Sequence, residues 1–140
     1  MSGVNKDCPN LNDHNYKFYG MIENIPQFLA GADIFVCTSK TEAGPMTVWE
    51  AMSMGIAVIT TDVGSVRQYI DDGESGFIVP VNDTKALVDR VIKLIENPSL
   101  IEKFGTASRK IAVNRLDVSI AAKKYANFYS KIINNYNSIG

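Results

Sequence analysis

The chain has 140 residues, with 14 Lys and Arg residues against 15 Asp and Glu residues, which gives a net charge of −1. This is the length of one ordinary domain, and the hydrophobic fraction of 46% is enough for a packed core. The balanced charge argues against a nucleic-acid partner or an anionic membrane, and no apolar run approaches the ~20 residues of a transmembrane helix.

Cysteine and histidine residues are too few and too scattered for a disulfide framework or a metal site. Cys8 lies in a polar stretch and Cys37 in an apolar one, while His14 is the single histidine. The N-terminus lacks the basic region and apolar core of a signal peptide. We therefore expect a reduced, cytoplasmic protein with no metal ion.

Residues 1–15 are rich in Asn, Asp, Ser and Gly, and we expect them to be irregular. The folded part is predicted to span residues 16–140, beginning with a short aromatic strand at residues 16–19. Asn24 then follows as a helix cap, with Pro26 at the first helical position.

The middle of the chain has the pattern of a parallel α/β unit. Residues 33–38 form a nearly continuous apolar strand, as expected where helices cover both faces of a sheet. A loop leads into a helical pattern at 46–54, which ends at Gly55, and a second strand follows at 57–61. This order is that of a right-handed crossover between parallel strands.

The rest of the chain continues the α/β pattern and then becomes helical. A short helix is predicted at 66–70 and a strand at 77–81. Three helices follow, starting at Asp83 or Thr84, at Ser99 and at Asp117. The last helix carries an apolar stripe that we expect to pack against the core; it comprises Ala121, Tyr125, Phe128 and Ile132.

The loop before the helix at 46–54 has features of an anion site. Pro45 fits the first helical position, and Gly44 allows close approach of a ligand or a positive φ. A helix N-terminus offers unpaired N–H groups and a partial positive charge, which suit a phosphate.

Two glutamates flank this loop. Glu42 precedes it and Glu50 lies about one turn into the helix. Carboxylates repel phosphate, but they accept hydrogen bonds from hydroxyl groups such as those of a sugar or a ribose. The layout therefore matches a nucleotide-diphosphate sugar. The alternative is that both glutamates lie on a solvated helix face and that the Gly-Pro pair is an ordinary turn.

The segment resembles the Glu-x7-Glu motif of the retaining GT-B glycosyltransferases of family four, also called group 1. Glu42 and Glu50 match its two glutamates, and residues 50–55, EAMSMG, are similar to its helix end. Residues 57–64 and 72–80 resemble the strand and the DGxxGxLVP stretch that follow in the family. The resemblance runs from about residue 16 to residue 136. One departure is the Gly44-Pro45 pair, where many members have Phe-Gly, and it affects donor preference.

The resemblance implies a Rossmann-like half of a two-domain enzyme, the C-terminal half that binds the nucleotide-sugar donor. It implies transfer to an acceptor hydroxyl with retention and without a metal ion or cofactor. Glu42 would contact the transferred sugar as the catalytic candidate, and Glu50 would hold the ribose. The remaining donor-binding candidates are Met21 near the base and, around the diphosphate, Gly44, Pro45, Met46 and Thr47.

The resemblance also implies that parts are missing. The N-terminal acceptor-binding half of the family has no counterpart in this sequence. Two strand-helix units of the C-terminal half, which carry an Arg and a Lys that bind the diphosphate, have none either. We therefore expect a fragment that is inactive alone, with the cytoplasmic membrane face as an alternative location for the full enzyme. The strand at 33–38 would lose its neighbour. Either the strand at 16–19 moves next to it, or two copies associate through its edge, and we favour the second.

Two other functions compete with this prediction. One is a GT-B relative that modifies nucleotide sugars without transferring them, such as an epimerase, which the Glu-x7-Glu spacing disfavours. The other is a doubly wound interaction domain without a small-molecule site. Such domains typically carry an acidic cluster at the end of the first strand, which is absent from this sequence.

Overall fold

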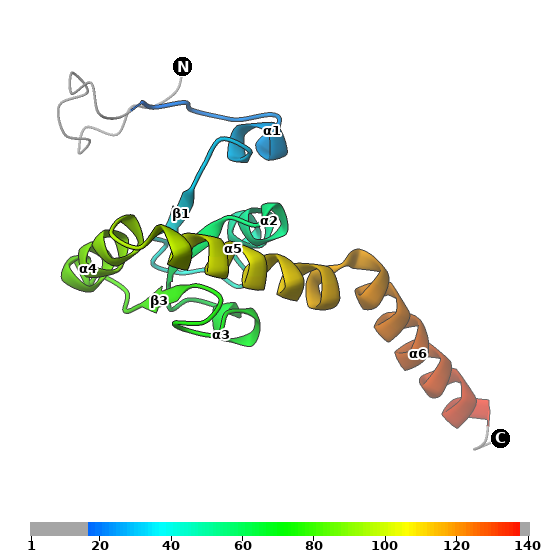
Figure 1. The fold of residues 1–140 in the computed structure, drawn as a ribbon. Helices are drawn as coiled ribbons and strands as arrows, with labels where there is room; N and C mark the ends of the chain where they lie inside the picture. Colours follow the sequence, from blue (N-terminus) through cyan, green and yellow to red (C-terminus); the bar gives the residue numbers. More distant parts are fainter. Residues whose placement is uncertain (1–16, 138–140) are drawn as a thin grey trace.

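A computed structural model describes residues 17–137 of the chain (Figure 1). The predicted irregular lead at 1–15, and Tyr16 with it, lies outside these residues. The elements follow in the order α1 (Ile25–Leu29), β1 (Ile34–Cys37), α2 (Met46–Met54), β2 (Ala57–Thr61), α3 (Val66–Tyr69), β3 (Phe77–Val79), α4 (Thr84–Ile95), α5 (Pro98–Ile111), the π-helix η1 (Ala112–Leu116) and α6 (Val118–Asn137).

The three strands form one parallel sheet in the order β1-β2-β3. Ile34 pairs with Ala57 in the first ladder, and Ile59 pairs with Phe77 in the second. Parallel neighbours require crossover connections, which α2 and α3 supply between successive strands. The predicted α/β class is therefore confirmed, with β2 at the centre and all five of its residues buried.

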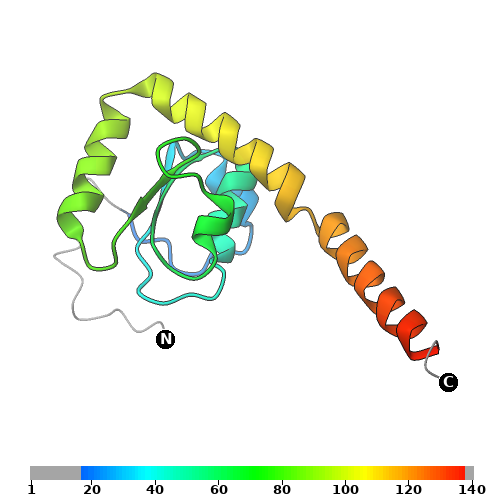
Figure 2. The same cartoon turned by 90° about the horizontal axis from the view of Figure 1, so that it is seen from below.

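Helices cover both faces of the sheet because the side chains of β2 alternate between two apolar clusters. Val58 packs in the cluster that includes Val48 and Met52 of α2. Ile59 packs on the other face with Phe104 of α5. Figure 2 shows the strands between α4 and α5 on one side and α2 and α3 on the other. β2 is buried along its whole length although it ends in Thr60 and Thr61, whose hydroxyl groups each donate a hydrogen bond to a backbone carbonyl.

The predicted strand at 16–19 is wrong over its described part. Lys17, Phe18 and Tyr19 are exposed and have no strand conformation. The Tyr19 ring instead packs edge-on against Phe28 of α1, with ring centroids 4.8 Å apart. Aromatic content alone does not make a strand, because a strand also needs a neighbour for its backbone hydrogen bonds.

The strand predicted at 33–38 lies at an edge of the sheet, as expected from the loss of its neighbour, whereas the expected cover of both its faces is incomplete. β1 is an edge strand whose single ladder partner within residues 17–137 is β2. Val36 is 40% exposed, so the face it occupies is incompletely covered. The alternative in which residues 16–19 move beside β1 is excluded for the described residues, whereas association of two copies remains a prediction.

Side-chain caps explain some of the helix starts. The Asn24 side chain accepts a hydrogen bond from Gln27 N–H at 3.1 Å, as predicted, although Pro26 is at the second helical position. Asp83 caps α4 by accepting from Ala86 N–H at 2.8 Å. The start of α5 differs from the prediction, because Pro98 begins the helix and Ser99 lies inside it.

The last helix departs most from expectation. α6 leaves the body of the molecule at η1 and projects away from it, in both views (Figures 1 and 2). The stripe of Ala121, Tyr125, Phe128 and Ile132 is exposed to solvent instead of packed against the core. Within residues 17–137 no helix is long and apolar enough to cross a membrane.

Candidate functional site

The candidate site is the loop between β1 and α2, at the carboxyl end of the sheet. Ligands bind at this edge in open parallel sheets. α2 begins at Met46, and Pro45 is its N-cap with an extended ψ of 96°, so Pro45 precedes the helix instead of occupying its first position. The Pro45 carbonyl accepts hydrogen bonds from Val48 and Trp49 N–H. The N–H groups of Met46 and Thr47 have no intrahelical partner, and no side chain caps them.

Gly44 has an ordinary backbone conformation. Its φ is not in the left-handed region, so the positive φ that the sequence left open as one alternative is excluded. A Cβ added at Gly44 would lie 3.4 Å from Ser65 Oγ and 3.7 Å from Trp49 Nε1, which are ordinary contact distances. Close approach of a ligand therefore stays a prediction for Gly44.

Glu42 is exposed at the start of this loop. The Ser39 hydroxyl donates a hydrogen bond to Glu42 Oε1 at 2.9 Å, which orients the carboxylate. Within residues 17–137 the ion pairs are Asp62–Arg67 and Glu74–Lys103, so no described cation neutralises Glu42. The second oxygen, Oε2, accepts no hydrogen bond from a described residue and is therefore available to an external donor.

Glu50 is half-buried on the first turns of α2 and lines a hollow between α1, α2 and η1. The cavity has a volume of about 390 Å³, within the range of small-ligand sites. Its lining is mostly apolar: Pro26, Leu29, Met46, Trp49, Glu50, Ser53, Met54 and Leu116. A single carboxylate in an apolar hollow suits a ligand with a flat apolar body and a few hydroxyl groups.

Met21 is not brought into this hollow. It is 95% exposed, on the segment before α1, and is not among the lining residues. The structure therefore places Glu42, Gly44, Pro45, Met46, Thr47 and Glu50 along one loop and helix start, and leaves Met21 at the surface.

Spacing in the sequence did not reveal the residues that hold the loop in place. The buried Thr61 hydroxyl, at the end of β2, donates to the Ser39 carbonyl at 2.6 Å. Ser65 N–H donates to the Ala43 carbonyl at 3.1 Å. Gly64 has a φ of 53°, and a Cβ there would lie 2.6 Å from the Glu42 carbonyl oxygen. The loop at 39–45 thus rests directly on the backbone of the loop after β2.

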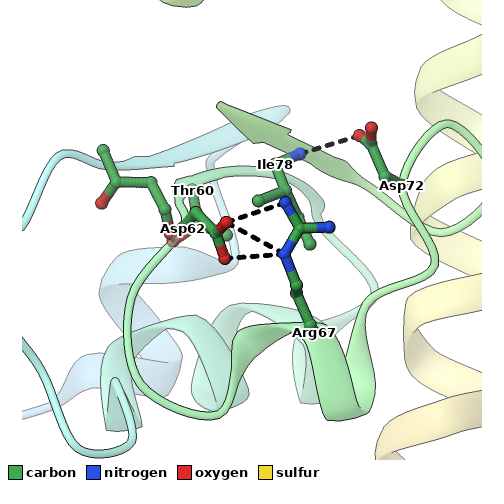
Figure 3. Close-up of polar contacts among 6 residues, drawn as sticks. Thr60, Asp62, Arg67, Asp72 and Ile78 are labelled. Atoms are coloured by element: carbon green, nitrogen blue, oxygen red, sulfur yellow. Dashed lines mark hydrogen bonds and ion pairs between the residues drawn. The ribbon is translucent and has the colours of Figure 1, made fainter. Parts of the chain in front are cut away.

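A charged pair stabilises that supporting loop (Figure 3). Arg67 donates from Nε and Nη2 to the Asp62 carboxylate at 2.7–2.9 Å. The hydrogen bond and the charge of Asp62 both raise the pKa of Arg67. The Asp72 carboxylate accepts a hydrogen bond from Ile78 N–H at 2.9 Å, which holds the loop before β3 against that strand. Both partners of the ion pair are exposed, so solvent screens the pair and its main effect is on the geometry of the loop.

A second hollow lies where the three strands end. It measures about 170 Å³, and Thr38, Thr61 and Pro80 contribute to its lining together with the start of α4. No local motif in the sequence points to this hollow, because its lining comes from three separate segments, at residue 38, at residue 61 and at residues 79–87. Within the described residues no group of three or more His, Cys, Asp and Glu side chains could hold a metal ion.

Comparison with known proteins links this geometry to one family. The family model described as glycosyl transferases group 1 matches residues 9–111. The putative glycosyltransferase EpsD of Bacillus subtilis is 34% identical over 113 residues, which are 81% of this chain and 29% of EpsD. The chain spans about 30% of the length of the curated relatives it matches.

Solved structures show the same fold. Anabaena HepE in complex with UDP-glucose superimposes with a TM-score of 0.77 at 26% identity, over 82% of this chain and 32% of HepE. The C-terminal domain of the group 1 glycosyl transferase LpcC from Francisella tularensis gives a TM-score of 0.67 at 28% identity, over 72% of this chain and 53% of that one.

Proposed function

The chain belongs to the group 1 glycosyl transferases, and we propose that it is the donor-binding part of such an enzyme. In the complete protein it would bind a nucleotide-diphosphate sugar, whose sugar is transferred to an acceptor hydroxyl with retention of configuration. The observation that carries the proposal is the uncapped N-terminus of α2, flanked in sequence by Glu42 and Glu50, neither of which forms an ion pair with a residue of the described range 17–137.

Each part of the donor has a chemically suitable place. The diphosphate would lie at the N–H groups of Met46 and Thr47, where the helix dipole favours negative charge. Glu50, at the edge of the 390 Å³ hollow, would accept hydrogen bonds from the ribose hydroxyls. Glu42, already oriented by Ser39, would accept from hydroxyls of the transferred sugar.

Catalysis would then depend on donor geometry and charge stabilisation. Backbone N–H groups that face a leaving diphosphate stabilise the charge that develops on it, without a metal ion. We assign Glu42 to positioning of the reacting sugar and to no nucleophilic or general-base step. Retention is proposed from the family resemblance. The family also favours transfer over the epimerase and interaction-domain alternatives.

The test is calorimetric titration of this chain with UDP-, GDP- and ADP-sugars and the parent nucleotides, beginning with UDP-glucose because HepE was solved with it. For the base that binds, Glu50→Ala should weaken the nucleotide and the nucleotide sugar alike. Glu42→Ala should weaken the nucleotide sugar and leave the nucleotide unchanged. Loss of a charged hydrogen bond of about 1.5–3 kcal/mol corresponds to roughly tenfold or more in Kd.

The matched control is Glu102→Ala, which removes an exposed carboxylate from the middle of α5. It should leave both affinities unchanged. If it weakens binding as much as Glu50→Ala, or if neither candidate glutamate alters binding, the assigned site is wrong. The 140 residues alone should give no product in a mass-based transfer assay, because they span only about 30% of the length of the curated relatives.

A further inference from the structure

Ser39 links Glu42, the candidate sugar contact, to the strand ends beneath it. The Ser39 hydroxyl donates to Glu42 Oε1 at 2.9 Å, and its oxygen accepts weakly from the Cys37 thiol at 3.6 Å. An ionised carboxylate only accepts hydrogen bonds, so the single proton of the Ser39 hydroxyl lies between Ser39 and Glu42. Ser39 therefore has no proton left for a ligand, and its effect on a ligand passes through Glu42.

The backbone on both sides of Glu42 is held by the end of β2 and the loop after it. The Ser39 carbonyl accepts from the hydroxyl of Thr61 at 2.6 Å, and Thr61 is buried at the end of β2. The Ala43 carbonyl accepts from Ser65 N–H at 3.1 Å. Because both ends of the segment 39–43 are held, the Ser39 hydroxyl has a defined position next to the Glu42 carboxylate.

The contact between Ser39 and Glu42 adds little to the stability of the loop. It is exposed, so water competes for both groups and the net gain from the hydrogen bond is small. The bonds from Thr61 and Ser65 already hold the loop backbone. What the contact does hold is the exposed Glu42 side chain, which without it would sample several rotamers.

This arrangement decides which ligand group Glu42 can accept. Oε1 already accepts one hydrogen bond, whereas Oε2 accepts none from a residue in the range 17–137. A sugar hydroxyl is a donor that Oε2 can accept, and neither Glu42 nor Ser39 has a proton to offer to an acceptor group. The pair therefore favours a sugar with a hydroxyl group at the contacted position over an analogue with hydrogen or fluorine there.

We propose that Ser39 is a positioning residue for sugar recognition: by holding Glu42 Oε1, it aims Oε2 at one hydroxyl group of the transferred sugar. The inference rests on the proposed function, because it needs Glu42 to contact the sugar of a nucleotide-sugar donor. It adds that this contact is prepared before the donor arrives. A prepared side chain strengthens binding, because its rotamer freedom is already lost in the free protein.

The first measurement is made on the free chain. Side-chain coupling constants from isotope-labelled NMR should show one dominant rotamer for Glu42, and averaging between rotamers in Ser39→Ala. Ser39→Thr keeps the hydroxyl and should restore the dominant rotamer. The control is Ser99→Ala, which removes an exposed hydroxyl near the start of α5 and should leave Glu42 unchanged. Averaged couplings in the original chain, or unchanged couplings in Ser39→Ala, would overturn the proposal.

The second measurement is calorimetric titration with UDP-glucose and UDP, or with the GDP or ADP pair if that pair binds instead. Ser39→Ala should weaken the nucleotide sugar about three- to tenfold and leave the nucleotide unchanged. In the Glu42→Ala background the same change should have no further effect, because Ser39 acts through Glu42. Among analogues of the sugar that each lack one hydroxyl, one should bind the original chain as weakly as the complete donor binds Glu42→Ala.

The outcomes separate this inference from the function on which it rests. If Glu42→Ala weakens the nucleotide sugar and Ser39→Ala does not, the positioning role of Ser39 is wrong and the proposed function stands. A further loss on adding Ser39→Ala to Glu42→Ala would also overturn the role, because Ser39 would then act independently. If no nucleotide sugar binds, or if Glu42→Ala leaves its affinity unchanged, the proposed function fails and this inference fails with it.

Discussion

Gly64 is the residue on which the shape of the candidate loop depends most directly. Its φ of 53° lies in the left-handed region, which residues with a Cβ atom rarely adopt. Its Cα also faces the carbonyl oxygens of Glu42 and Ala43, so that an added Cβ would collide with backbone. The backbone cannot move away, because Ser65 N–H is hydrogen-bonded to Ala43 at this point.

We therefore expect Gly64→Ala to destabilise the fold by about 1–3 kcal/mol, through strain and displacement of the loop. Urea unfolding followed by circular dichroism measures the free energy of unfolding. Gly31→Ala is the control, because a Cβ there meets nothing within 4 Å and φ is not positive. Equal stability of the Gly64 variant and this control would show that the loop does not rest on Gly64.

The sequence pointed to candidate site residues but not to the residues that support them. Glu42 and Glu50 were identified because their spacing around a Gly-Pro turn is visible along the chain. The hydrogen bond from Thr61 to Ser39 joins residues 22 positions apart, and the contact below Glu42 depends on Gly64. Neither of these two contacts is marked by a periodicity or a local motif in the sequence, because both form only when the loop after β1 lies against the loop after β2.

At the scale of elements, boundaries were predictable where a local stop signal exists. The helix at 46–54 and the strand at 57–61 have the predicted bounds. Gly55, with φ 75°, ends the helix in the left-handed conformation and separates the two patterns. The strand at 16–19 had no such support, and its aromatic residues pack against α1 instead of joining the sheet.

The start of α6 depends on a titratable cap. Asp117 accepts a hydrogen bond from Ser119 N–H at 2.7 Å. Hydrogen bonds from the Ser119 side chain and backbone lower the pKa of Asp117 below its ordinary value of 3.8. Because the pKa of Asp117 is lower in the folded protein than in the unfolded chain, its ionised carboxylate stabilises the folded protein at pH values above the pKa of the unfolded chain. This stabilisation is lost as the pH falls through the lower pKa of the folded protein.

We therefore expect the helical signal of α6 to fall as the pH drops below about 3.8. Asp117→Asn, which still caps but does not titrate, should reduce this loss. Circular dichroism between pH 7 and pH 2 measures the loss of helical signal, and isotope-labelled NMR assigns that loss to residues 118–137. An identical acid response in the Asn variant would show that Asp117 is not the group responsible.

At the scale of the whole molecule, periodicity showed that α6 is amphipathic but not what covers its apolar face. The repeat of apolar residues is the same whether a core, a second chain or a lipid surface lies opposite. The packed stripe expected from the sequence was wrong for this reason. The same holds for β1, whose apolar sequence is typical of a strand covered on both faces, although Val36 is 40% exposed.

The uncovered edge of β1 leads to a prediction about assembly. Along its outer side, β1 presents N–H and C=O groups that have no ladder partner among residues 17–137, next to the 40%-exposed Val36. Such an edge is a template for pairing with another chain. We expect two copies to associate through β1 as concentration rises. Light scattering across a concentration series measures this, and a monomer at all concentrations would contradict it.

A charge on the edge strand should oppose this pairing. It therefore distinguishes association through β1 from association through α6. Val36→Lys should raise the midpoint concentration of association about fivefold, because a charge within an apolar strand pair costs on the order of 1 kcal/mol. Val88→Lys makes the same substitution at a similarly exposed position on α4, and should leave the midpoint unchanged. If both variants associate like the original chain, the contact lies elsewhere than at β1, because only a β1 contact responds to a charge at residue 36.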